Sequence, residues 1–200
     1  MAFSRRTVLA GLPLWLSTPA LQPLAPKSIS PELHLVKAAR RQIGVTTSYD
    51  GRYQSISYPG GDVPIETGVC IDVVIRAYRS AFEVDFQKLI HEDMRSNFSA
   101  YPNIWGLSRT DRNIDHRRVP NVETWLKRRG FEREPTDWMP GDIVSMRLGN
   151  RLPHIGILST RRDRRGRPLG IHNIGAGTRE EPLLGRFENE RRFRFLDFTV

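Results

Sequence analysis

Three residues of this chain could together cleave an acyl bond: one cysteine and two histidines. Cys70 is the single cysteine among 200 residues, and it stands at the start of a run with apolar residues at helical spacing. His154 and His172 lie on two later segments with the character of strands. A cysteine attacks a carbonyl as its thiolate, and a helix N-terminus together with a nearby imidazole lowers the pKa of the thiol. The pattern therefore predicts a nucleophile with a lowered pKa, its base and a residue that orients the base.

Each of these residues also has an ordinary structural interpretation. A lone cysteine among hydrophobic residues is most often a small buried core residue, and a lone histidine is most often a hydrogen-bonded part of the core. The ordered set favours catalysis, with His154 as base and later acid. His172 and its neighbour Asn173 both remain candidates for the residue that orients His154. Because side chains alternate along a strand, these two point to opposite faces and only one of them can serve.

The periodicity of the apolar residues predicts helices first and strands afterwards. Predicted helices cover residues 32–43, 70–82, 85–98 and 121–129, the last one capped by Asn121 and ended by Gly130. Predicted strands cover residues 142–148, 154–160, 169–174 and 191–198. Helices followed by antiparallel strands are typical of the α+β class. Two hundred residues without an internal repeat fit one domain, which we place at residues 26–200.

Residues 1–25 are expected to be an export signal rather than part of the fold. Arg5 and Arg6 precede a short apolar stretch at residues 8–16, and small residues follow it. This order is typical of a secretory signal, and the paired arginines favour the bacterial twin-arginine route. The stretch is too short for a comfortable membrane span, although an uncleaved anchor is the alternative. The sequence thus predicts a periplasmic or otherwise exported protein, with no stable membrane span after signal removal.

Basic residues outnumber acidic ones by 31 to 22, which gives a formal net charge of +9. Much of this charge lies between two predicted strands, in the run Arg161-Arg162-Asp163-Arg164-Arg165-Gly166-Arg167. We exclude DNA and RNA as partners, because the run lacks interleaved aromatic residues and the chain carries no nucleic-acid motif. Peptidoglycan or another anionic envelope polymer is the partner that the charge favours. The spacing of ligand-type residues predicts no metal site and no other cofactor, and the pattern leaves the oligomeric state open.

Several motifs occur in a fixed order along the chain. They are a cysteine at a helix start, the turn Pro140-Gly141-Asp142, the strand His154-Ile155-Gly156-Ile157-Leu158 and the strand Gly170-Ile171-His172-Asn173. Tyr58 and the pair Gly60-Gly61 precede the cysteine. This order resembles the NlpC/P60 peptidases, papain-like cysteine hydrolases of bacterial cell-wall peptides. The resemblance covers roughly residues 50–175 and implies a papain-like fold, with N-terminal helices packed on an antiparallel sheet.

The chain is more similar still to the bacterial domain-of-unknown-function family 1287. The hallmarks are Gly68-Val69-Cys70-Ile71-Asp72-Val73-Val74, Asn113-Ile114-Asp115-His116-Arg117-Arg118-Val119-Pro120 and His172-Asn173-Ile174-Gly175-Ala176-Gly177. That family is assigned to the same papain-like group, and no established substrate comes with the resemblance.

The resemblance to the peptidases implies a role for each matching residue. It implies Cys70 as the nucleophile, His154 as the base and His172 as the orienting residue, with Tyr58 lining the site. Asn173 is the alternative orienting residue and, failing that, a substrate contact.

Two charged residues near these motifs are further candidates for substrate binding. In the peptidases an aspartate before the cysteine recognises a substrate amino group, whereas Val69 occupies that position here. Asp72 follows the cysteine by two residues and is expected to cap the helix or to bind substrate. Arg117 is expected either to grip a substrate carboxylate or to join an internal salt bridge.

Three classes of function follow from this pattern. The leading one is a cysteine amidase or endopeptidase that acts on peptidoglycan peptides through a Cys-His-His triad. The second is acyl transfer or ester cleavage on the same fold. The third is a non-catalytic envelope-binding domain with a dormant site. The intact set of Cys70, His154 and His172 speaks against the third class, because a dormant site tolerates the loss of one member.

Overall fold

The protein is described here from a computed structural model, which covers residues 29–149 and 151–197. Its helices in this range are α1 (Pro31–Arg40), α2 (Cys70–Phe82), α3 (Phe86–Ser96) and α4 (Val119–Arg128), with the short 3-10 helices η1 (Phe98–Ala100) and η2 (Asp115–Arg117). Its strands are β1 (Ser48–Tyr49), β2 (Thr67–Gly68), β3 (Glu132–Arg133), β4 (Ile143–Leu148), β5 (Leu152–Arg162), β6 (Pro168–Asn173), β7 (Thr178–Pro182) and β8 (Glu188–Phe193).

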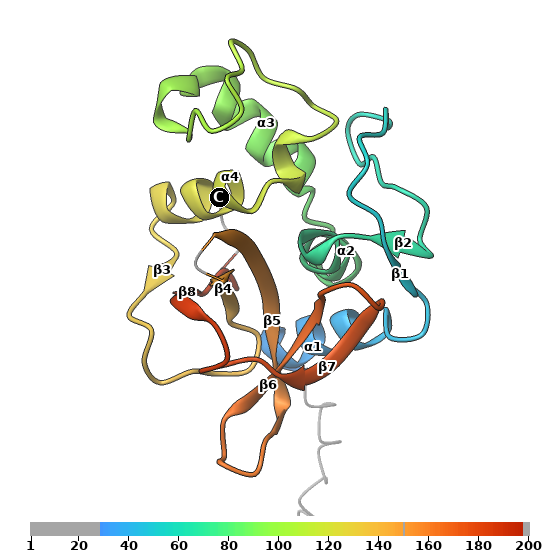
Figure 1. Cartoon of the computed structure of the whole chain (residues 1–200), viewed down its shortest axis with the longest axis vertical. Helices are drawn as coiled ribbons and strands as arrows, with labels where there is room; N and C mark the ends of the chain where they lie inside the picture. The colour runs from blue at the N-terminus through green and yellow to red at the C-terminus, as the bar shows by residue number, and fades with distance from the viewer. Residues whose placement is uncertain (1–28, 150, 198–200) are drawn as a thin grey trace, which may run out of the picture.

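Six of the strands form one antiparallel sheet in the order β3-β8-β4-β5-β6-β7 (Figure 1). The hairpin from β4 to β5 pairs Ile143 with Ile157 at one end and Leu148 with Leu152 at the other. β1 and β2 form a separate parallel pair, and β2 ends just before Cys70. The sheet therefore brings β5 and β6, the strands of the two histidines, next to each other.

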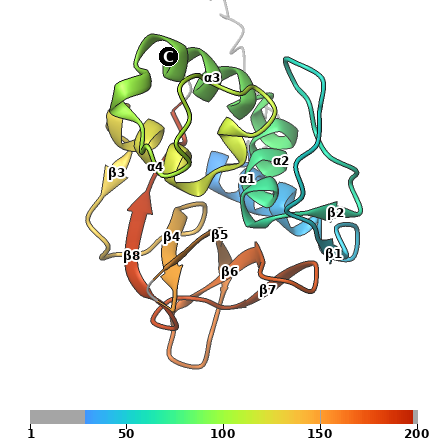
Figure 2. The same cartoon turned by 45° about the horizontal axis from the view of Figure 1, so that its top comes forward.

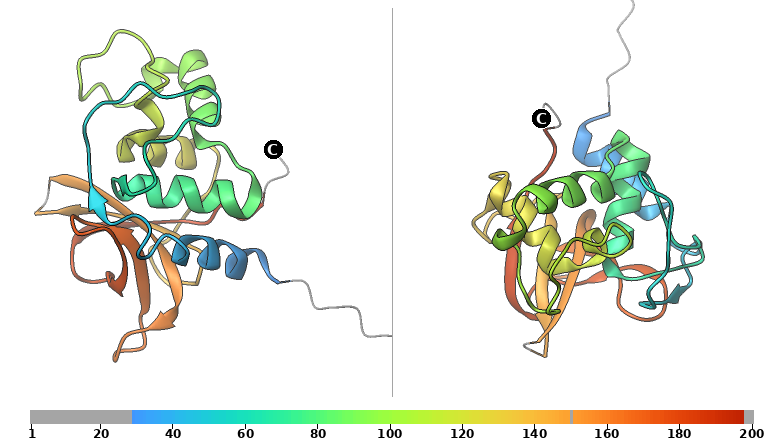
Figure 3. Two further views of the ribbon diagram at one scale, coloured as in Figure 1. Left: turned by 90° about the vertical axis from the view of Figure 1, so that its right-hand side faces the viewer. Right: turned by 90° about the horizontal axis from the view of Figure 1, so that it is seen from above.

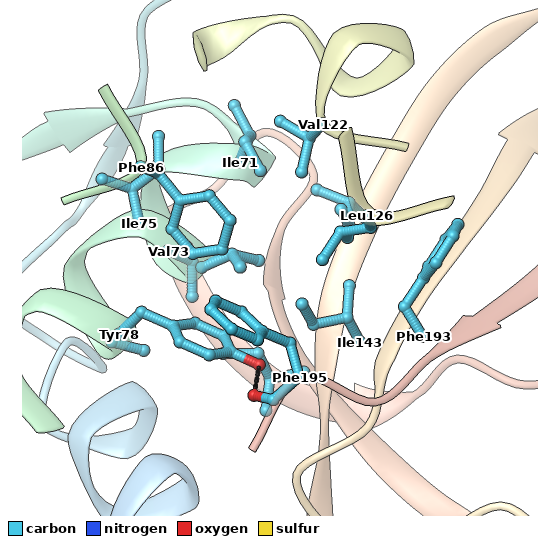
Figure 4. Packing of buried hydrophobic residues seen from close by; sticks show 14 of the residues in the cluster. Ile71, Val73, Ile75, Tyr78, Phe86, Val122, Leu126, Ile143, Phe193 and Phe195 are labelled. Atoms are coloured by element: carbon cyan, nitrogen blue, oxygen red, sulfur yellow. Dashed lines mark hydrogen bonds between the residues drawn. The ribbon is translucent and has the colours of Figure 1, made fainter. Parts of the chain in front are cut away.

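The helices gather on one face of the sheet (Figures 1 and 2). α2 packs on β5 and β6, and α1 lies beside α2, as the left view of Figure 3 shows. On this face, alternate strand residues such as Ile155, Ile157 and Ile171 join the main core. Tyr78 of α2 stacks on Phe195 with 5.4 Å between ring centroids, and its hydroxyl donates to the carbonyl of Phe195 at 2.9 Å (Figure 4). This packing fixes the position of α2, and with it the height of Cys70 above the sheet.

The opposite face of the sheet is also buried, under the chain that follows β7. The strand residues whose side chains point to this face, such as Met146 and Leu158, contact Leu183 and Leu184. His154 pairs with Met146 across β4 and β5, so its side chain points to this second face. Consecutive residues of β5 consequently alternate between two separate hydrophobic cores, one on each face of the sheet.

The connection between β1 and β2 is hydrogen-bonded to the connection between η1 and η2. Tyr53, between β1 and β2, donates its hydroxyl hydrogen to Asp111 at 3.0 Å, and Asn113 donates to Tyr53 at 2.8 Å. The backbone N–H of Ile56 also donates to Asn113, at 3.1 Å. The left view of Figure 3 shows these loops side by side at the top of the molecule. These three hydrogen bonds therefore hold the two connections against each other.

The α+β class, the helices-first order and the antiparallel sheet are confirmed. α2 begins at Cys70 and ends at Phe82, as the periodicity predicts, and Glu83 ends it in the left-handed conformation with a φ of 59°. α3 lies within its predicted range, α1 begins one residue before its predicted range and ends three residues early, and β4, β5 and β6 match three of the predicted strands within two residues at each end.

Three local expectations were wrong. α4 begins at Val119 with Arg118 at its N-cap, because Pro120 suits the first turn of a helix, so Asn121 lies inside the helix rather than capping it. The last strand covers Glu188–Phe193 rather than 191–198, and residue 198 lies outside the described residues. β7 was not predicted, because its sequence TREEP lacks the apolar alternation of a half-buried strand.

The expected export signal at residues 1–25 lies outside the described residues. Among the residues that the structure describes, none of the helices has the length and apolar character needed to cross a lipid bilayer.

Candidate active site

Cys70 is the first residue of α2, with Val69 at the N-cap. The carboxylate of Asp72 accepts the backbone N–H of Val69 at 2.7 Å, which satisfies a donor at the helix start. The Cys70 side chain is 3% exposed. Its sulfur therefore lies at a helix N-terminus, as predicted, but in a nearly closed environment.

Burial dominates the electrostatics of the thiol. It raises the pKa of Cys70 to about 12, and the negative charge of Asp72 acts in the same direction. Backbone N–H groups of Ile155, Ile71 and Cys70 itself oppose this rise by hydrogen bonding to the sulfur. The prediction of a lowered pKa is thus wrong for the resting protein, in which the thiol is neutral. The same N–H groups are arranged to stabilise negative charge next to the sulfur.

His154 and His172 lie in direct contact on neighbouring strands. Nε2 of His154 and Nδ1 of His172 are 2.8 Å apart, and the ring planes meet at 81°. Gly156 makes this approach possible. A Cβ atom there would lie 3.1 Å from Cβ of His172 and 3.0 Å from the carbonyl oxygen of Ile171. The predicted contact between His154 and His172 is therefore present in the structure.

A third residue, Glu181, stands behind His172. Its Oε1 lies 3.3 Å from Nε2 of His172, a charge contact without the alignment of a hydrogen bond. The contact follows from the register of β6 and β7, in which Gly170 pairs with Glu181 and His172 pairs with Arg179. The sequence pattern does not indicate Glu181, because this diagonal contact depends on β7, a strand that the pattern does not predict.

The contact with Glu181 selects the proton positions of both rings. An ionised carboxylate only accepts hydrogen bonds, so it favours a proton on Nε2 of His172. Nδ1 of His172 then accepts the proton on Nε2 of His154. Nδ1 of His154 is left with its lone pair, which is the form that a base requires.

Both imidazoles are neutral at neutral pH. Burial lowers the pKa of His154 to about 3, and the neighbouring His172 adds to that shift. Burial likewise lowers the pKa of His172 to about 4, with a smaller contribution from Arg186. Since a neutral imidazole can take a proton and a protonated one cannot, His154 is available as a base over the whole physiological range.

Cys70 and His154 lie on either side of the same strand. The N–H of Ile155 contacts the sulfur, and Ile155 follows His154 directly in the chain. Ile155 belongs to the core under α2, whereas the ring of His154 lies near Phe187 on the opposite face. Within the described residues, no hydrogen bond joins the thiol to the imidazole at rest. Active-site hydrogen bonds often tighten only when substrate binds, so proton transfer here requires a closer approach of the two groups.

The tyrosine near Cys70 is Tyr49, which is 46% exposed. Partial burial of its hydroxyl raises its pKa to about 12, with Cys70 and Asp72 adding to the rise. Tyr58, predicted to line the site, instead packs edge-on against His91 with 5.3 Å between ring centroids. Tyr49 is the last residue of β1 and pairs with Gly68 of β2. This pairing brings Tyr49 close to the start of α2. The resemblance thus pointed to the wrong tyrosine of the same connection.

Asp72 and Arg117 bind each other rather than a substrate. Nε and Nη2 of Arg117 each donate to one carboxylate oxygen of Asp72 at 2.9 Å. The two residues are 2% and 7% exposed. Of the two alternatives predicted for each residue, the structure shows the helix cap for Asp72 and the internal salt bridge for Arg117, and this ion pair braces the start of α2 against η2.

Asn173 points away from the histidines. Its Nδ2 donates to the carbonyl oxygens of Gly68 and Ser48 at 3.0 and 3.1 Å, and its Oδ1 accepts the N–H of Gly175 at 3.1 Å. These bonds hold β1 and β2 against the end of β6. Asn173 thus does not contact His154, and His172 is the residue that does.

Two comparisons place this site in a family. The domain of unknown function DUF1287 matches residues 36–195, a range that includes Cys70, His154, His172 and Glu181. The chain is also 51% identical over 185 residues to the protein named Uncharacterized protein YijF from Escherichia coli (strain K12), covering 90% of each chain. The chain therefore belongs to the DUF1287 family.

Proposed function

We propose that the protein is a cysteine hydrolase of amide bonds, with Cys70 as nucleophile and His154 as base. The observation that carries this proposal is the chain of contacts from Glu181 through His172 to His154. That chain leaves an unprotonated Nδ1 on a residue adjacent to the peptide N–H that contacts the thiol. A purely structural histidine pair needs neither a helix-start cysteine nor a fixed tautomer beside it.

The reaction begins from a neutral thiol and a neutral imidazole. Substrate binding brings Nδ1 of His154 from the other face of β5 to the thiol. As Sγ of Cys70 attacks the carbonyl carbon, the thiol proton passes to Nδ1 of His154, and the carbonyl oxygen gains the negative charge. The N–H groups around the sulfur stabilise that oxyanion. His154 then protonates the leaving amine as the C–N bond breaks. Water, deprotonated by the same Nδ1, hydrolyses the thioester and restores the thiol.

The order of the elements supports a papain-like fold of the NlpC/P60 kind for this chain. In it, a cysteine begins a helix that packs on an antiparallel sheet, and two neighbouring strands carry the base and the orienting residue. This chain has that order in α2, β5 and β6. The proposed substrate is accordingly a peptidoglycan peptide, and the net charge of +9 suits an anionic envelope polymer.

Digestion of purified peptidoglycan tests the proposal directly. Wild-type protein, Cys70→Ala and the control Glu188→Gln, an exposed residue of β8, are incubated with it, and fragments are identified by mass spectrometry. We expect wild type and control to release the same peptides and Cys70→Ala to release none. Fragments that persist with Cys70→Ala would rule the mechanism out. Cleavage confined to ester substrates would favour the second class of function instead.

The proposed site of action is the periplasm, reached through the signal at residues 1–25. The paired arginines support the twin-arginine route. Replacing Arg5 and Arg6 together by lysine should keep the protein in the cytoplasm, as measured by fractionation. Unchanged recovery from the periplasm would refute that route while leaving export itself intact.

A further inference from the structure

A cavity lies apart from the proposed catalytic residues, between the end of α3, the chain after η1 and the start of α4. Its volume is about 310 Å³, at the lower end of the range for small-molecule sites, roughly 300–1,000 Å³. Its walls are largely apolar and include Met94, Phe98, Trp105 and Leu107. Its polar end is formed by residues of the first turn of α4.

Arg118 is the cationic residue of this cavity, and its guanidinium has no ion-pair partner within 4 Å in the part of the chain that the structure describes. Its guanidinium lies over the ring of Trp105 at 4.1 Å from the centroid. Among the described residues the guanidinium forms no hydrogen bond or ion pair, and its buried Nη1 is without a partner. Desolvation lowers its pKa, with only partial compensation from Asp115 and Asp111. The adjacent Arg117, by contrast, is fully paired with Asp72.

Asn121 supplies an acceptor at the same end of the cavity. It is 1% exposed, and its Nδ2 donates to the carbonyl oxygen of Asp115 at 3.0 Å, which fixes the orientation of the amide. Its Oδ1 has no hydrogen-bond partner. A buried polar atom without a partner costs free energy, so a ligand that supplies the missing hydrogen bond gains binding free energy there. Arg118 and Asn121 are three residues apart at the helix start and therefore share one side of it.

We propose that this cavity binds the carboxyl-terminal residue of a peptide or an acylated amino acid. The carboxylate pairs with Arg118, the amide N–H of the same residue donates to Oδ1 of Asn121, and an aliphatic side chain contacts Met94, Phe98 and Leu107. An anion alone would leave the acceptor of Asn121 unused, and a neutral amide would leave the charge of Arg118 unpaired. A ligand with both groups on neighbouring atoms satisfies both residues.

The cavity and the proposed catalytic site share no lining residue, and the binding does not rest on hydrolase activity. Isothermal titration calorimetry of the full-length protein therefore uses three probes: N-acetylleucine, N-acetylleucinamide and 4-methylpentanoate. The second lacks the charge and the third lacks the N–H group. We expect N-acetylleucine to bind at least tenfold more tightly than either analogue. Equal binding of all three would overturn the proposal.

Variants locate the binding. Arg118→Gln should weaken the binding of N-acetylleucine about tenfold or more, because a charge-assisted hydrogen bond is lost. Asn121→Asp, which places a negative charge beside the ligand carboxylate, should weaken it at least as much. Arg164→Gln, in the exposed hairpin between β5 and β6, should change nothing.

Two controls keep the outcome interpretable. Cys70→Ala should bind N-acetylleucine like wild type, and loss of binding in that variant would assign the ligand to the catalytic site and overturn the proposal. Thermal unfolding of each variant shows whether it is folded. If Arg118→Gln does not fold, the three probes on wild type and Asn121→Asp decide the question by themselves.

Discussion

The substitution Glu181→Gln tests most directly whether Glu181 selects the tautomers of His172 and His154. The change keeps the size of the side chain but removes the charge that favours a proton on Nε2 of His172. A glutamine amide can donate to that nitrogen as well as accept from it. The reverse tautomer of both rings then becomes accessible, in which Nδ1 of His154 carries the proton and cannot receive the one from Cys70.

The size of the effect follows from the geometry. The carboxylate oxygen lies 3.3 Å from Nε2 of a neutral ring, so it acts on the N–H dipole, and an interaction of this kind with a charged group contributes about 1.5–3 kcal/mol. Two features reduce it: Glu181 is partly exposed, with 29% of its side chain accessible, and Arg186 lies 3.5 Å from the same oxygen. We therefore expect about 1–2 kcal/mol to remain, or a loss of roughly fivefold to thirtyfold in turnover. His172→Ala, which removes the orienting ring itself, should cost on the order of 10⁴.

Nuclear magnetic resonance of the imidazole nitrogens measures the tautomer without any substrate. In wild type, Nδ1 of His154 should have the chemical shift of an unprotonated nitrogen and Nε2 that of a protonated one. Glu181→Gln should move the two shifts toward each other, and Glu188→Gln should leave them in place. If Glu181→Gln leaves both the shifts and the turnover unchanged, the carboxylate does not select the tautomer and the reasoning fails.

Three further changes test the electrostatics of the site and its surroundings. Alkylation of Cys70 by iodoacetamide, followed against pH, should show a midpoint above the free-thiol value of about 8.5, because burial raises the pKa of the thiol; a lower midpoint would contradict this. Arg117→Met should destabilise the protein by about 3 kcal/mol in urea unfolding, because it leaves the Asp72 charge buried and unpaired; normal stability with weakened substrate binding would instead restore a substrate role. Burial lowers the pKa of His116 to about 4, so its contribution to stability is present above pH 6.5 and is lost as pH falls toward 4. Wild type should consequently lose about 2 kcal/mol more than His116→Gln between pH 7 and pH 5, and equal losses would refute the shift.

The parts of the site that the sequence predicted are those fixed by local pattern. Helical periodicity and the residues before Cys70 indicated where α2 begins. Alternation along β5 and β6 placed the two histidines on adjacent strands and showed that His172 and Asn173 could not both face His154. Each of these inferences needs only a few consecutive residues and the geometry of one element.

The parts that sequence reasoning missed depend on contacts between distant segments. The Asp72–Arg117 pair joins residues 45 positions apart, and nothing in either motif states which partner satisfies the charge. Tyr49 and Tyr58 occupy the same connection, and only the pairing of β1 with β2 brings the former to Cys70. Glu181 acts through the register of an unpredicted strand. A pattern that ranks candidates by residue type cannot resolve such choices, because they are decided by the packing of the whole chain.

The thiol pKa was misjudged for a related reason, and the correction bears on mechanism. A helix start lowers the pKa of a thiol when the sulfur remains solvated, but burial penalises the thiolate more strongly here. The same burial lowers the pKa of His154, so an ion pair of thiolate and imidazolium is disfavoured from both sides. The proposed reaction must then create its charges together, with the N–H groups of Cys70, Ile71 and Ile155 in place to stabilise them.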